Sequence, residues 1–302
     1  MTPWRLQIAE LIRPIRGWLP RGANFLYKRI MGQYSTYRGD MELKKILNNP
    51  NRVFFDQFLQ ANVYVDISDW ACRAHYYKGI YYDRTVPLLI EHILSNGGTF
   101  IDIGANRGLH TLHAANVLGV KGNIYAFEPH PVTFEILKSH LTINGIKNCH
   151  PFNIGISNKQ GSLELNMFTD QHSGTCSFIN TSEIHDSVSV PVKKLDDVLT
   201  NDKLLSPVLV KIDVEGFEFN VLQGMEQMLD RADIHIICEI TDEWLVKTGS
   251  SAASLVEFLR KRGFSVYLPT ISHSNFITEK LELTLINELP NNRQFDAVFI
   301  RT

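Results

Sequence analysis

The stretch Thr99–Leu112, TFIDIGANRGLHTL, decides the fold, because it changes from a strand pattern to a helix pattern across a turn bounded by two glycines. Its apolar strand carries Asp102 near the end, and the turn GANRG follows. Glycine at positions 104 and 108 permits positive φ and a close approach of the backbone to a ligand. A strand that leads through such a turn into a helix is typical of an open α/β sheet, whose ligands bind beyond the carboxyl ends of the strands.

The same alternation of strand and helix patterns extends along the chain from about residue 83. Near-continuous apolar strands separated by helices predict a parallel sheet covered on both faces. The expected strands are 99–104, 123–129, 149–157, 207–216, 234–240, 264–269 and 295–302, and the expected helices are 85–94, 109–118, 131–144, 219–230 and 252–263. Residues 157–200 interrupt the alternation with a predicted β-hairpin and a long polar loop, and such loops are more often functional than not.

Residues 1–82 form a separate region, an N-terminal basic arm followed by a short β flank, ahead of the domain at 83–302. Residues 1–38 hold seven basic side chains and one acidic one. Apolar residues recur there at helical spacing: Trp4, Ile8, Leu11, Ile12 and Ile15. We favour an arm packed on its own domain or on a partner subunit, and the alternative is a peripheral contact with an anionic membrane surface. Aromatic and β-branched residues predict short strands over 53–82.

The composition excludes several classes of protein. The 302 residues are 44% apolar and 21% charged, which is ordinary for a globular chain, and the net charge of −2 gives no case for nucleic-acid binding. Four scattered cysteines without a Cys-x-x-Cys pair argue against a disulfide framework or a structural zinc site and favour a reducing compartment. The absence of a run of about 18 apolar residues or of a signal-peptide core leads us to expect a cytoplasmic protein.

An acid at the end of the next strand limits the class of ligand that the glycine turn can bind. Glu128 follows the glycine turn by about two dozen residues, where an acid can accept both hydrogen bonds of a ribose diol. The G-x-G-x-x-G spacing of dinucleotide-binding turns is absent, and Asp102 would repel a pyrophosphate, which disfavours NAD. The two acids instead fit an adenosyl ligand with a cationic tail, in which Asp102 faces the ammonium and sulfonium end.

Three segments resemble a known family. FIDIGANRGLHTL, YAFEPHPVTFEILKSHLTINGI and VKIDVEGFEFNVLQGM are similar to the signature segments of the FkbM-type S-adenosylmethionine-dependent methyltransferases, and the similarity runs in order from about Tyr77 to the C-terminus. The resemblance implies a class I, Rossmann-like methyltransferase fold with a seven-stranded sheet whose last strand, at 295–302, is antiparallel. It also implies S-adenosylmethionine as cofactor and O-methylation, usually of a hydroxyl on a sugar or a secondary metabolite.

The resemblance implies a role for particular positions of this sequence that match the family's motifs. The cofactor turn corresponds to Asp102, Gly104, Asn106 and Gly108, and the ribose acid to Glu128. The motif after the fourth strand, beside the transferred methyl, corresponds to Asp213, Glu215 and Gly216, and the segment 172–177 resembles part of the family's variable loop. Leu109 and His110 depart from the pattern, since relatives commonly carry aromatic residues there, so the contour on the acceptor side can differ.

Methyl transfer to a hydroxyl needs alignment and a base. Asp213 and Glu215 are the best-placed candidate bases, Glu239 on the next strand is the third, and His172 is a candidate substrate contact or base in the loop. Their alternative roles are to orient the cofactor amine or to cap a helix, and for Glu218 a surface acid at the helix start is the preferred interpretation.

Metal binding and turnover each allow two interpretations of the sequence. The clustered carboxylates could hold Mg²⁺, but no complete ligand set is visible, so we expect no metal; His110, His113 and His130 lack a third zinc ligand. The function is an active O-methyltransferase or, alternatively, a cofactor-binding scaffold without turnover, and the acids at three strand ends favour activity. The acceptor is a small molecule or a glycan, and an oligomer is compatible with the sequence.

Overall fold

The computed structural model describes residues 49–78, 83–168, 176–179, 184–201, 204–274, 278–290 and 294–301. Its contacts divide the chain into two compact units, Met1–Tyr82 with Asp170–Ser173, and Asp83–Thr169 with Gly174–Thr302. The basic arm of residues 1–38 lies outside the described residues, so its contact with a domain, a partner or a membrane stays a prediction. Within the described part of the chain, no helix is long and apolar enough to cross a membrane.

The first unit contains an antiparallel hairpin and a helix. Strands β1 (Asn51–Asp56) and β2 (Ala61–Asp66) confirm the expected short strands, but α4 (Trp70–Lys78) is helical where strands were expected. The carboxylate of Asp69 accepts a hydrogen bond from the Cys72 N–H at 2.8 Å, and the buried Arg73 guanidinium donates to the Ile67 carbonyl at 2.9 Å. This capping at the helix start outweighs the strand propensity of the aromatic residues.

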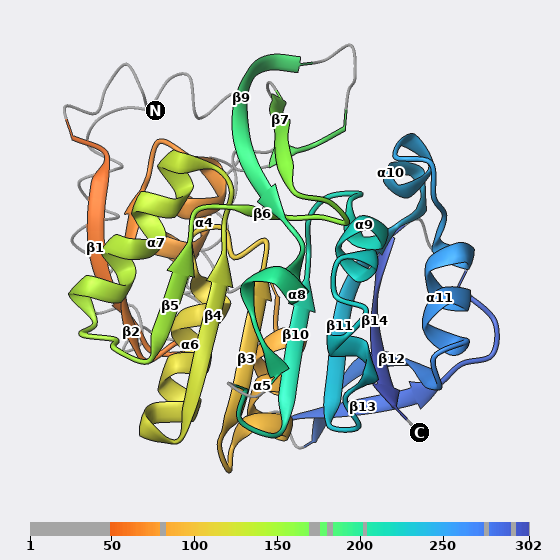
Figure 1. The fold of residues 1–302 in the computed structure, drawn as a ribbon. Helices are drawn as coiled ribbons and strands as arrows, with labels where there is room; N and C mark the ends of the chain where they lie inside the picture. Colours follow the sequence, from red (N-terminus) through yellow and green to blue (C-terminus); the bar gives the residue numbers. More distant parts are fainter. Residues whose placement is uncertain are drawn as a thin grey trace. The chain divides into compact units, whose positions relative to one another are not determined.

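An eight-stranded sheet forms the centre of the second unit, in the order β13–β12–β14–β11–β10–β3–β4–β5 (Figure 1). The strands are β3 (Gly98–Ile103), β4 (Gly122–Phe127), β5 (Cys149–Phe152), β10 (Val208–Ile212), β11 (Ile234–Thr241), β12 (Phe264–Ser274), β13 (Thr278–Leu285) and β14 (Gln294–Arg301). β14 runs antiparallel to both of its neighbours, which confirms the expected last strand. The sheet has one strand more than expected, because β13 forms a hairpin with β12.

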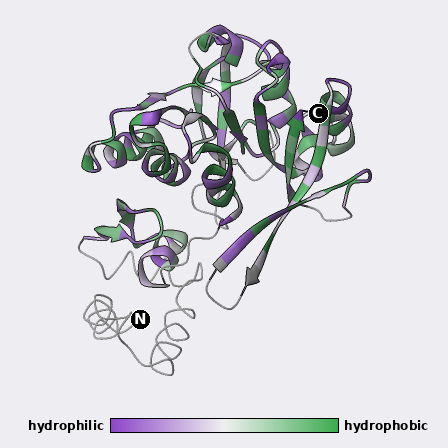
Figure 2. Cartoon of the chain, turned by 90° about the horizontal axis from the view of Figure 1, so that it is seen from below, coloured by the Kyte–Doolittle hydropathy of each residue, from purple (hydrophilic) through white to green (hydrophobic). Residues whose placement is uncertain are grey.

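Helices cover both faces of this sheet, as the strand pattern predicted. They are α5 (Thr85–Leu94), α6 (Leu109–Leu118), α7 (Pro131–Ile143), α8 (Leu195–Val198), α9 (Glu218–Gln223), α10 (Asp242–Lys247) and α11 (Ala252–Arg260), with single 3-10 turns η2 (Gly119–Lys121) and η4 (Met228–Asp230). Helices α5, α6 and α7 share one apolar cluster with the sheet, and α8, α9, α10 and α11 share the other. Figure 2 shows the central strands as largely hydrophobic, in agreement with their burial.

The interruption at 157–200 contains the expected hairpin. β7 (Gly161–Phe168) and β9 (Ile184–Lys193) pair antiparallel, and β6 (Gly155–Ile156) and β8 (Cys176–Ser177) complete a four-stranded sheet in the order β6–β9–β7–β8. In Figure 1 this small sheet lies beyond the carboxyl ends of the parallel strands. It therefore stands at the edge where an open α/β sheet binds its ligands.

Candidate active site

The site is placed by the order of the strands. From β3 the chain proceeds outward to β4 and β5, and it returns on the other side of β3 at β10. The strand order therefore reverses between β3 and β10, and such a switch point is where open α/β sheets bind ligands. The glycine turn after β3 and the acidic turn after β10 both lie at this point.

The glycines of the turn are required by contacts within the protein. Gly104 has a φ of +77°, and a Cβ there would lie 1.9 Å from the carbonyl oxygen of Asp213. Gly108 has a φ of +80°, and its Cβ would lie 2.3 Å from Cδ1 of Leu137. In the structure these glycines make room for the end of β10 and for the side of α7, and the close approach of a ligand to the turn stays a prediction. The exposed Asn106, with a φ of +51°, forms the tip of the turn.

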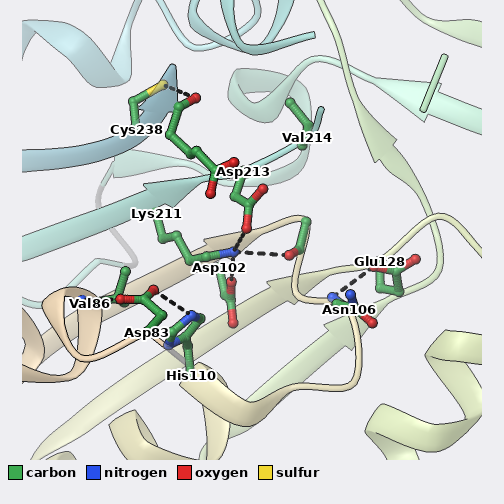
Figure 3. A network of polar contacts seen from close by, with 12 residues as sticks. Asp83, Val86, Asp102, Asn106, His110, Glu128, Lys211, Asp213, Val214 and Cys238 are labelled. Carbon is green, nitrogen blue, oxygen red and sulfur yellow. Dashed lines mark hydrogen bonds and ion pairs between the residues drawn. The ribbon is translucent and has the colours of Figure 1, made fainter. Parts of the chain in front are cut away.

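Glu128 joins the end of β4 to this turn. Its Oε2 accepts the N–H of Asn106 at 2.8 Å (Figure 3), and its Oε1 accepts the N–H of His130 at 2.9 Å. Burial raises the pKa of Glu128 to about 7, against the lowering effect of these two N–H groups. The structure thus brings together Glu128 and the turn, as the sequence predicted.

A buried ion pair lies between the two strands of the switch point. Asp102 and Lys211 are register partners on β3 and β10, and both side chains are buried. The Thr111 hydroxyl donates to Oδ2 of Asp102 at 2.7 Å, and the Lys211 Nζ lies 3.5 Å from Oδ1. The carboxylate of Asp102 is fully buried among these partners, and its expected contact with a cofactor ammonium stays a prediction.

Lys211 was missed by the sequence reasoning. Besides Asp102, its ammonium contacts the Gly104 carbonyl oxygen at 3.1 Å and Oδ2 of Asp213 at 3.2 Å (Figure 3). The available signal was a single lysine within the apolar strand VLVKI, because a charge inside a buried parallel strand requires partners.

The turn after β10 and the first residue of α9 together carry three acids. Glu215 has a φ of +53°, and burial, together with the neighbouring Asp213 and Glu239, raises its pKa to about 8. The Asp213 side chain is 35% exposed, so it is open to a ligand. Glu218 was expected at the surface, which is wrong: it is 2% exposed, and its Oε1 accepts the Gly216 N–H at 2.9 Å. Its carboxylate caps the turn instead of facing solvent.

Two more acids lie on the neighbouring strands. Glu239 on β11 is the register partner of Asp296 on β14, and Gln294 donates a hydrogen bond to Glu239. Burial, then Asp213 and Asp296, raise the pKa of Glu239 to about 8. Burial raises the pKa of Asp296 to about 6, with contributions from Asp83 and Asp213. Asp296 was not singled out from the sequence, because its place opposite Glu239 depends on the antiparallel register.

The small sheet contacts the turn that holds these acids. The Ser177 hydroxyl donates to the Glu215 carbonyl oxygen at 2.5 Å, and the rings of Phe178 and Phe217 lie 5.1 Å apart. A Cβ at Gly216 would meet Cδ1 of Ile179 at 2.6 Å. Residues 177–179 therefore pack directly on the turn, whereas the candidate His172 lies outside the described residues.

The histidines of α6 are paired with carboxylates. Nε2 of His110 lies 3.2 Å from Asp83, and Nε2 of His113 lies 3.1 Å from Glu91 (Figure 3 shows the first pair). Over the residues that the structure describes, no three His, Cys, Asp or Glu side chains are arranged to hold a metal ion.

Comparison with known proteins assigns the part of the chain that holds this site to a family. The family model described as the methyltransferase FkbM domain matches residues 102–266. Hexuronic acid methyltransferase AglP of Haloferax volcanii is 29% identical over 139 residues, 45% of this chain, which spans only 53% of that protein. Methyltransferase 1 of Beauveria bassiana is 26% identical over 186 residues, 55% of this chain and 72% of that protein. The chain also matches a solved FkbM methyltransferase from Methylobacillus flagellatus KT at 13% identity and a TM-score of 0.43, over 81% of this chain and 57% of that one.

Proposed function

Because this chain belongs to the FkbM methyltransferase family, we propose that it transfers the methyl group of S-adenosylmethionine to a hydroxyl oxygen of a sugar-containing acceptor. The observation that carries the proposal is Glu128, buried at the switch point and joined to the glycine turn through the Asn106 N–H. The sugar acceptor is supported by the name of the Haloferax relative, a hexuronic acid methyltransferase.

The residues at the turn fit an adenosyl cofactor. Each oxygen of Glu128 accepts one backbone N–H and keeps a second lone pair, so the carboxylate can still accept the two hydrogen bonds of a ribose diol. When bound, S-adenosylmethionine supplies an electrophilic methyl group on a sulfonium. The acids at both sides of the switch point favour this cationic ligand over a pyrophosphate.

The acids of β11 and of the turn after β10 divide into two roles. Asp213 is partly exposed and ion-paired with Lys211, so it is suited to accept the proton of the acceptor hydroxyl. Glu215 and Glu239, each with a pKa raised to about 8, are mostly protonated at neutral pH and are suited to donate hydrogen bonds to the acceptor. Alignment contributes about 7–11 kcal/mol and a base about 10²–10⁴-fold in such reactions.

The proposal is tested with labelled S-adenosylmethionine and a panel of neutral, amino and uronic glycosides. We expect saturable cofactor binding by calorimetry and an O-methyl signal in the NMR spectrum of at least one product. Methyl transfer to nitrogen or carbon alone would contradict the hydroxyl acceptor. Tight cofactor binding with no transfer to any acceptor would favour a cofactor-binding scaffold instead.

A further inference from the structure

Lys211 is a buried cation at the point where the two halves of the site meet. It belongs to β10, every residue of which is buried, and an ammonium is retained in such a place only with partners. Three of its contacts belong to different parts of the site: Asp102 on β3, the Gly104 carbonyl of the glycine turn, and Asp213 at the end of β10.

These contacts of Lys211 join the glycine turn after β3 to the acidic turn after β10, and the two turns also contact each other directly. The Gly104 Cα lies so close to the end of β10 that a Cβ would overlap the Asp213 carbonyl, and the Asp213 N–H donates to the Ile103 carbonyl at 3.1 Å. The backbone of the glycine turn and that of the acidic turn are therefore one packed unit. Lys211 adds the polar link between them, and Asp102 is held in turn by Thr111 of α6.

The charge of Lys211 acts on both sides of the switch point. It lowers the pKa of Glu128 on the cofactor side, and it lowers the pKa values of Glu215, Glu239 and Asp296 on the other. Asp102 has the opposite effect on Glu128, whose pKa it raises. Among the described residues, the other titratable groups that interact with these carboxylates include Asp83, His110, Glu218, Cys149 and Cys238.

We propose that Lys211 is a positioning residue for the reaction: its ammonium fixes the glycine turn and Asp213 in one arrangement and serves as the shared counter-ion of the carboxylates around them. The proposal rests on the proposed function for its consequence in methyl transfer. The counter-ion role itself can be measured without turnover.

The decisive variant is Lys211→Met, which keeps the stem and removes the charge, beside Lys211→Arg, which keeps the charge. Carboxyl ¹³C NMR titrations should show the midpoints of Glu128 and Glu239 rising by about one pH unit in Lys211→Met, in the range that one nearby charge produces. The same midpoints should stay near their original values in Lys211→Arg. Lys261→Met is the matched control, because Lys261 is exposed and forms its ion pair with Glu257, far from the carboxylates of the site in the sequence.

The second readout is binding and turnover against pH. Because Glu128 must be ionised to accept ribose hydroxyls, cofactor affinity in Lys211→Met should fall at least threefold at pH 7 and recover by pH 9. Methyl transfer should fall at least tenfold even when cofactor is saturating. A loss of melting temperature with unchanged carboxyl titrations and an unchanged pH profile would overturn the proposal and leave Lys211 a purely structural residue.

If Lys211→Met does not fold, a second variant that shifts the Glu128 midpoint in the opposite direction tests the proposal. Asp102→Asn removes an acid that shares Lys211, so the Glu128 midpoint should fall instead of rise, and an unchanged or raised midpoint contradicts the proposal. If the wild-type protein transfers no methyl group while these titrations shift as expected, the proposed function fails and the counter-ion role stands.

Discussion

Single residues of the glycine turn allow close internal packing and hold Glu128, the acid that we propose for the cofactor ribose. Gly104 and Gly108 avoid overlap with Asp213 and Leu137, while the N–H of Asn106 between them binds Glu128. The sequence predicted that Glu128 and the turn act together, because both follow strands of one parallel sheet. It could not predict Lys211, since its contacts depend on the register between β10 and β3.

The first prediction concerns Glu128→Gln. The variant should lose about 1.5–3 kcal/mol of S-adenosylmethionine affinity for each charge-assisted hydrogen bond to the ribose. In the wild type the affinity should fall as the pH drops from 8 to 6, because the raised pKa of Glu128, about 7, leaves it protonated at the lower pH. Calorimetry at both pH values measures this, with Glu135→Gln, an exposed acid on α7, as control. Equal affinity of wild type and Glu128→Gln at pH 8 would exclude a ribose contact.

The second prediction separates backbone strain from close packing. Gly104→Ala and Gly145→Ala both place a side chain at positive φ, +77° and +64°, but a Cβ at Gly145 meets nothing within 4 Å. Gly104→Ala should therefore cost about 1–3 kcal/mol more free energy of unfolding, the range for overpacking. Denaturant unfolding of both variants provides the comparison, and equal costs would mean that the turn and Asp213 are not in tight contact.

At the scale of elements, the turn after β10 and the strands β11 and β14 bring together Glu215, Glu239 and Asp296, which are largely held away from water. Their pKa values are raised, so the folded protein binds protons that the unfolded chain has already released. The contribution of such a group to the free energy of unfolding declines as the pH rises from the group's pKa in the unfolded chain toward its higher pKa in the folded protein. The site is thus built at a cost in stability near neutral pH.

The third prediction follows for Glu215→Gln. The pKa of Glu215 is about 8 in the folded protein, whereas the ordinary pKa of a glutamate is 4.5. Glu215 therefore lowers the free energy of unfolding increasingly between pH 4.5 and pH 8, and has no such effect at lower pH. We expect the variant to have a higher melting temperature than the wild type at pH 8.5 and the same one at pH 4.5. Scanning calorimetry at the two pH values measures the difference, and a melting temperature that is lower at pH 8.5 would mean that the ionised Glu215 is stabilised by its surroundings.

At the scale of the molecule, hydrophobic pattern was a reliable guide to the central sheet and its covering helices, since near-continuous apolar runs have few other places to fold. The hydrophobic pattern gave the wrong prediction where a few polar contacts determine the local structure. Trp70–Lys78 is helical because Asp69 and Arg73 satisfy the helix start, and Glu218 is buried because it caps the turn before it. β13 was missed although Leu281 and Leu283 alternate with polar residues and pack on the core.

The central claim is that Asp213 acts on the acceptor while Glu128 and the turn hold the cofactor. Its most direct test is single-turnover methyl transfer from S-adenosylmethionine, measured beside calorimetric cofactor affinity, for Asp213→Asn and for Glu257→Gln, an exposed acid, as control. We predict that Asp213→Asn keeps most of its cofactor affinity and loses at least about 10²-fold in the transfer rate, the low end for removal of a general base. Transfer at the wild-type rate, or a loss explained entirely by weaker cofactor binding, would contradict this account.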